Sequence, residues 1–159
     1  MEEYILNNLD ILKINRRHRL YYGGSQEWFF NFFKKQAGCG PTTATNLFIY
    51  LAKTDDYFKN LFQDEINYDN VLKMMHQVWK DITPGMMGVN RVDILENGAQ
   101  KYAKGHDVTI NTLSFTVEPY KSNEHDIKDF LVEQLSHNRP VAFLNLSSDE
   151  DSPADSLSQ

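Results

Sequence analysis

The chain has 159 residues, of which 41% are hydrophobic and 13% aromatic, so it is long and apolar enough for one domain with a substantial core. Its formal net charge is −6, from 22 acidic and 16 basic residues, which argues against a protein whose main partner is nucleic acid. It has no apolar run near the roughly 20 residues of a membrane span, no basic amino-terminal export signal, and only one cysteine. We therefore expect a cytoplasmic domain with no membrane partner, no nucleic-acid partner and no internal disulfide.

The first strong helix signal follows an aromatic run at residues 28–33. Gly40 and Pro41 favour a helix that begins at one of them, because the amide hydrogen that proline lacks is unpaired in the first turn in any case. Apolar residues then recur at helical spacing, at Ala44, Leu47, Phe48 and Leu51. This pattern predicts a helix over about residues 41–52, with the aromatic run packed beneath it or lining a cleft.

The spacing predicts three further helices in the middle of the chain. They cover about residues 55–62, 69–80 and 90–105. Asp69 is a good cap for the second of them, and Asn90 with Asp93 resembles a capping pair for the third. Gly105 is expected to end the third helix. Helices therefore dominate the first two thirds of the predicted fold.

The hydrophobic period changes in the last third of the chain. Apolar residues alternate with polar ones over residues 108–117, which predicts one bent strand or two short strands. A helix over about residues 123–136 leads into a last apolar strand at residues 141–146, and the acidic, serine-rich residues 147–159 are typical of a disordered tail. We expect one α+β domain over residues 1–146, a helical lobe followed by a small antiparallel sheet.

Cys39 lies just before the amino end of the predicted helix over residues 41–52. Unpaired amides and the helix dipole make such an end electropositive, which favours the thiolate over the thiol. A thiolate held there can attack a carbonyl carbon. The alternative is that Cys39 is a small buried residue that carries no chemistry.

The segment Gln-Ala-Gly-Cys-Gly-Pro-Thr-Thr-Ala-Thr-Asn, residues 36–46, resembles the nucleophile helix of papain-like cysteine peptidases, most of all the bacterial branch that includes the double-glycine leader peptidases. The resemblance implies a papain-like fold and a peptide or protein substrate. It also implies that Cys39 is the nucleophile, and that its backbone amide and Gln36 stabilise the oxyanion. From the residues alone, Gln36 can also be a solvated loop residue.

In the papain-like family, a histidine at the start of a later strand accepts the thiol proton. His106, which follows Gly105 at the start of a predicted strand, is the best local candidate for this base, and His137 is a second one. Each of them can also be an ordinary surface histidine. The family's histidine-bearing strand is not reached before the acidic tail begins, so we expect a truncated or frameshifted peptidase with weak or absent activity.

The sequence has neither the paired ligand spacing of a zinc site nor a glycine-rich phosphate motif, so no metal and no cofactor are expected. Two other functions stay open. One is a non-catalytic binding or assembly module, in which the aromatic run and the open edge of the last strand contact a partner or form a homodimer. The other is a different cysteine-dependent acyl transferase, such as a transglutaminase-like enzyme.

Overall fold

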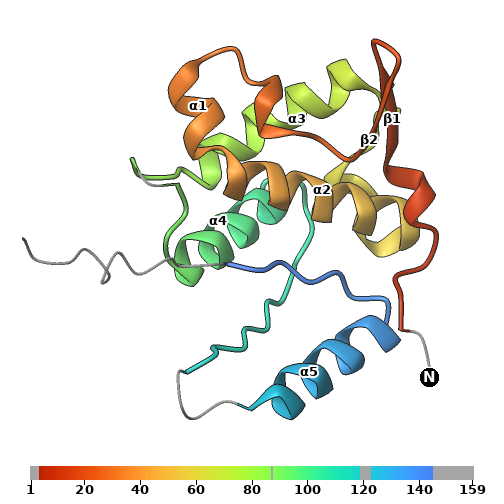
Figure 1. The fold of residues 1–159 in the computed structure, drawn as a ribbon. Coiled ribbons are helices and arrows are strands. Elements are labelled where there is room, and N and C mark those ends of the chain that lie inside the picture. The colour runs from red at the N-terminus through yellow and green to blue at the C-terminus, as the bar shows by residue number, and fades with distance from the viewer. Residues whose placement is uncertain (1–3, 87, 119–122, 145–159) are drawn as a thin grey trace, which may run out of the picture.

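A long central helix, α2, organises the fold of this chain (Figure 1). The computed structural model describes residues 4–86, 88–118 and 123–144. In chain order the elements are η1 (Leu9–Leu12), β1 (Lys13–Arg16), β2 (Arg19–Tyr22), η2 (Gln26–Trp28), α1 (Phe32–Ala37), α2 (Cys39–Thr54), η3 (Asp56–Leu61), α3 (Tyr68–Asp81), α4 (Val92–Lys104) and α5 (Glu124–Ser136), where η denotes a 3₁₀ helix. This composition of helices with one small antiparallel sheet confirms the α+β class.

The hydrophobic core lies where α2, α3 and α4 meet. The two later helices pack against α2 and against each other. Phe48 of α2 stacks on Tyr102 of α4 with ring centroids 4.9 Å apart, and Ile49, Met75 and Val78 are fully buried. Burial of such side chains contributes about 1.5–3 kcal/mol each, so these three helices carry most of the stabilisation of the fold.

The small sheet is a hairpin near the amino terminus, which the sequence analysis did not predict. β1 and β2 pair in antiparallel register, with Arg16 opposite Arg19, and Ile14 is buried in the core. The two loop residues, Arg17 and His18, both have positive φ, at 47° and 64°. Such turns usually carry Asn or Gly, so the basic cluster gave no hairpin signal.

The helices over the body of the chain lie close to their predicted ranges, and two of the predicted caps are wrong. Asn67, not Asp69, caps α3, because its side chain accepts a hydrogen bond from the amide of Asn70 at 2.9 Å. At α4 no side chain caps the helix; Asp93 instead accepts two hydrogen bonds from the Arg91 guanidinium. A strong neighbouring cation therefore displaced the expected capping contact.

The strands predicted for the last third of the chain do not form over the described residues. Residues 108–118 and 141–144 belong to no strand, and residues 145–146 of the last predicted strand lie outside the described part. Alternating apolar residues make a strand only where a neighbouring chain pairs with their backbone groups, and neither segment has such a ladder partner among the described residues. The sheet therefore precedes the helices, whereas the sequence analysis placed it after them.

The last two observations concern the predicted tail and the possibility of a membrane-crossing helix. The tail predicted at residues 147–159 lies outside the described residues. Within the described ranges, none of the helices combines the length and the apolar character that a membrane crossing requires.

Candidate active site

Cys39 is the first residue of α2, a helix of 16 residues. The helix begins one to two residues earlier than predicted, because the amide of Thr42 donates a 3.0 Å hydrogen bond to the carbonyl of Gly38. Gly38 alone separates α1 from α2. A side chain there would come within 2.7 Å of the Phe29 ring and 2.4 Å of the Lys34 carbonyl, so only glycine permits this tight junction.

A short turn packs over the start of α2 and forms a wall beside Cys39. Gly85 and Gly88 each donate a backbone hydrogen bond to the other's carbonyl, both at 3.1 Å. Gly88 has a φ of 84°, and a Cβ placed on it would lie 3.3 Å from Sγ of Cys39. The next residue, Val89, is buried against Gly40, where a Cβ would meet Val89 Cγ2 at 2.3 Å. Glycine at position 88 thus lets the thiol approach the backbone of the turn, and glycine at position 40 lets the Val89 side chain approach the backbone of α2.

The thiol of Cys39 is open to solvent on its remaining side. Cys39 is exposed and forms no disulfide. Across the described ranges, the thiol makes no hydrogen bond or ion pair with another side chain. A base that takes a proton from a thiol must lie about 2.6–3.2 Å away or act through one water, so the described part of the chain supplies no base in contact with Cys39.

Gln36 lies in the last turn of α1, three residues before Cys39, and not in a loop. Its side chain is exposed and has no hydrogen-bond partner among the described residues. An exposed amide can donate to an oxyanion only when a bound substrate brings that oxygen to it. The role of Gln36 as an oxyanion donor therefore stays a prediction.

The structure does not bring His106 to Cys39. His106 follows the carboxyl end of α4, where its Nδ1 lies 2.8 Å from the carbonyl of Tyr102 and its ring lies 4.2 Å from the Tyr102 ring. Tyr102 stacks on Phe48, nine residues along α2 from Cys39, which corresponds to about 13 Å of helix. Nδ1 of His137, the second candidate, donates to the carbonyl of Glu133 at 2.8 Å, at the end of α5.

A fifth group, His76 on α3, belongs to an aromatic cluster beneath α1 that sequence reasoning missed. Its ring lies 5.1 Å from Phe29, and its Nδ1 lies 3.4 Å from Nζ of Lys34. Burial, and then the positive charge of Lys34, hold the pKa of His76 below its usual range. His76 lies on the exposed side of α3, opposite the buried Val71, Met75 and Val78, so the helical spacing alone gives no signal for this cluster.

No metal centre forms at this site or elsewhere in the described ranges, where no group of three or more His, Cys, Asp or Glu side chains could hold an ion. The site thus contains one accessible thiol at the start of a helix, with the turn of Gly85 and Gly88 on one side of it. Comparisons with known proteins add no relative: no protein-family model matches the chain, and neither a curated protein nor a solved structure matches it.

Proposed function

We propose that this chain is a cysteine peptidase-like domain with a papain-like fold, in which Cys39 is the nucleophile that acts on peptide or related acyl bonds. The observation that supports the proposal most is the exposed thiol at the first residue of a 16-residue helix. The positive end of a helix dipole favours a negative charge, so it suits a nucleophilic thiol at this position. The resemblance of residues 36–46 to a peptidase nucleophile helix supports the same assignment.

The proposed reaction has two steps at Cys39. The thiolate attacks the substrate carbonyl, forms a carbon–sulfur bond and places negative charge on the carbonyl oxygen, near the Cys39 amide. The tetrahedral intermediate collapses as the carbon–nitrogen bond breaks, and the departing amine takes a proton. Water then hydrolyses the thioester and releases the acid. Because no described side chain contacts the thiol as a base, we expect weak or absent turnover.

The first test is the rate of Cys39 alkylation by iodoacetamide at neutral pH, in the folded protein and in denaturant. The helix end predicts a rate about two- to fivefold higher in the folded protein, which is the thiolate excess that about 0.3–1 kcal/mol gives. The variant Cys39→Ser must lose the label. A thiol that reacts only after unfolding would overturn the proposal.

A matched control places the same thiol at the opposite end of a helix. Ser136 is exposed and is the last residue of α5. In a Cys39→Ser, Ser136→Cys protein the negative end of the dipole disfavours the thiolate, so we expect alkylation no faster than in denaturant. Equal acceleration at both positions would show that helix polarity does not activate Cys39.

A non-catalytic assembly module is the second candidate function, because large apolar side chains stay exposed. Phe30 is 100% exposed and Phe32 is 73% exposed, next to the site. The extended residues 109–117 carry exposed Leu113, Phe115 and Val117 and have no charged side chain, so they lack the charges that usually protect an unpaired edge. These features support a homodimer formed through extended segments.

A further inference from the structure

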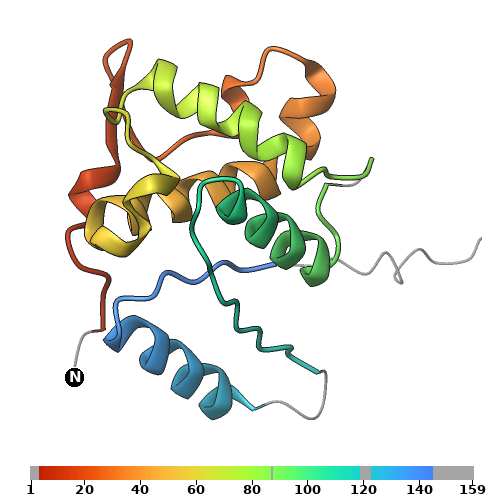
Figure 2. The same cartoon turned by 180° about the vertical axis from the view of Figure 1, so that it is seen from behind.

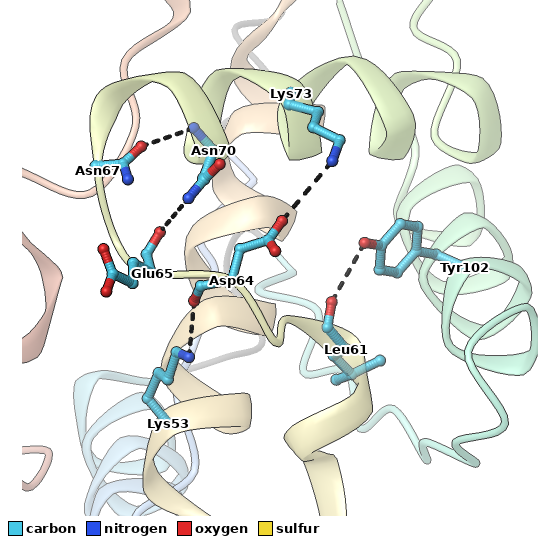
Figure 3. Close-up of polar contacts among 8 residues, drawn as sticks. All are labelled: Lys53, Leu61, Asp64, Glu65, Asn67, Asn70, Lys73 and Tyr102. Atoms are coloured by element: carbon cyan, nitrogen blue, oxygen red, sulfur yellow. Dashed lines mark hydrogen bonds and ion pairs between the residues drawn. The ribbon is translucent and has the colours of Figure 1, made fainter.

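A hollow of about 390 Å³ lies at the other end of α2 from Cys39, between residues 60–64, one face of α3 and the carboxyl end of α4. Figure 3 shows this region, with α3 above, Asp64 and Leu61 below it and Tyr102 reaching in from α4. The volume is at the lower end of the range for small-molecule sites. The hollow is therefore large enough for one small ligand, and it is separate from the thiol.

Hydrogen bonds between elements fix the walls of this hollow. The hydroxyl of Tyr102 donates to the carbonyl of Leu61 at 3.3 Å, which ties α4 to the end of η3 (Figure 3). The ammonium of Lys53 donates to the carbonyl of Asp64 at 2.9 Å. These contacts hold the segment after η3 in place, so the hollow does not depend on a free loop.

Several polar groups in the walls keep hydrogen-bonding capacity for a ligand. Nζ of Lys73 lies 3.9 Å from the Asp64 carboxylate, too far for a hydrogen bond, and Gln77 makes none with the described residues. Because a carbonyl only accepts, Nδ1 of His106 carries the proton in its 2.8 Å contact with Tyr102. Nε2 of neutral His106 is then an acceptor. The walls thus offer a cation, an amide and an imidazole acceptor together.

The balance of these groups restricts the chemistry of the ligand. Asp64 and Asp107 line the hollow with Lys73, so a small anion would meet two carboxylates against one cation. An apolar ligand would leave the polar walls without water or partners, which costs about 1–3 kcal/mol for each unsatisfied group. A hydroxyl group both donates and accepts, and it matches a mixture of donors and acceptors.

We propose that this hollow binds a small, neutral, hydroxyl-rich molecule of the sugar or polyol class, held by Lys73, Gln77 and His106. Lys73 and Gln77 lie on one face of α3 at i and i+4 spacing, so a single ligand contacts both. The site does not include Cys39, and its test is independent of the proposed peptidase chemistry.

The proposal is tested by titrating ¹⁵N-labelled protein with D-glucose, and separately with inorganic phosphate, while amide chemical shifts are recorded. We expect saturable shifts with glucose at about millimolar concentration, confined to residues around the hollow, and none there with phosphate. Absence of saturable shifts with glucose, or a stronger response of the same residues to phosphate, would overturn the proposal.

Two variants locate the binding. Lys73→Ala and Gln77→Ala each remove an exposed side chain and are expected to weaken glucose binding about two- to tenfold, the effect of one lost hydrogen bond. Lys80→Ala is the matched control, since Lys80 is an exposed lysine of the same helix that does not line the hollow. An equal loss of affinity in Lys80→Ala would show that binding depends on charge in general and not on this site.

Discussion

The helical body, residues 12–108, and the C-terminal arm, residues 109–144, differ in the extent to which they bury apolar side chains. In the body, α2 buries residues on most of its surface. In the arm, α5 fully buries only Gln134, while Leu113 is 66% and Phe143 77% exposed. Both views of the fold show α5 apart from the other helices (Figure 2). The difference shows that apolar residues at helical spacing predict a helix, while the neighbouring elements decide whether its apolar face is buried.

The few contacts that hold the arm are mostly polar. The Tyr50 hydroxyl on α2 donates to the carbonyl of Asn7 at 2.8 Å and contacts Oδ1 of Asn138. The amide of Asn7 donates to the same Oδ1 at 2.8 Å. Within the arm, Phe115 stacks on Phe130 with centroids 5.4 Å apart. Where the arm begins, Tyr57 and Gln100 donate hydrogen bonds to Thr109 and Thr112, and Ile110 packs against the core. The arm is thus connected to the body by a few polar contacts and by one partly buried apolar side chain.

The largest effect that this comparison predicts comes from matched truncations in the two regions. Ile49→Ala removes a fully buried side chain of α2 and is expected to lower the free energy of unfolding by about 2–5 kcal/mol. Leu131→Ala removes a half-buried side chain of α5, and we expect a loss of about 1 kcal/mol or less. Urea unfolding followed by tryptophan fluorescence measures both. Equal losses would mean that the arm is as much a part of the core as α2 is.

A second effect concerns the body at alkaline pH. Burial, and then the negative charge of Asp81, raise the pKa of Tyr102 to about 12. The unfolded chain releases this proton near its ordinary pKa of about 10, so the stability that neutral Tyr102 gives is complete below pH 10 and is lost as pH rises toward 12. We expect the urea midpoint to fall across this window.

The variant Tyr102→Phe isolates that titration. It loses the hydrogen bond to Leu61 at neutral pH but should show a flatter decline in stability above pH 10. A smaller slope remains, because burial also raises the pKa of Tyr50. If the wild type and Tyr102→Phe decline in parallel, Tyr102 is not protected from ionisation in the folded body.

The helices could be predicted from the sequence because their signals are local. The apolar stripe of α2 needs no knowledge of distant residues. The capping box of Asn123 and Asp126 at α5 is equally local, although the sequence analysis did not name it. The strand at 108–117 was predicted from local alternation and the one at 141–146 from an apolar run, but a strand depends on a partner that local sequence does not show. The hairpin at Arg17 and His18 was missed because residues other than Asn and Gly adopt its positive φ angles.

The candidate site shows the same limit. Cys39 at a helix start followed from Gly40 and Pro41, which are local signals. The wall formed by Gly85 and Gly88 did not, since it depends on a turn some 45 residues later packing against the thiol. The separation of His106 from Cys39 likewise depends on the direction of α4 along α2, which the stacking of Tyr102 on Phe48 fixes. Residue spacing alone therefore predicts neither the wall beside the thiol nor the separation of His106 from it.

The smallest predicted effect tests the junction itself. Tyr50→Phe keeps the buried ring but removes the hydroxyl that joins Asn7 to Asn138, so we expect a loss of about 1 kcal/mol, the usual value for one hydrogen bond. Because this contact connects the arm and not the core, the change should appear as faster hydrogen exchange at residues 137–144, with exchange in α2 and α3 unchanged. Thr45→Val is the control: it removes a hydroxyl of α2 that donates to the carbonyl of Pro41 in the same helix, and should leave exchange in the arm unaltered. Uniform acceleration of exchange over the whole chain in Tyr50→Phe would show that arm and body unfold as one cooperative unit. The two regions would then differ in the exposure of their side chains but not in their local stability.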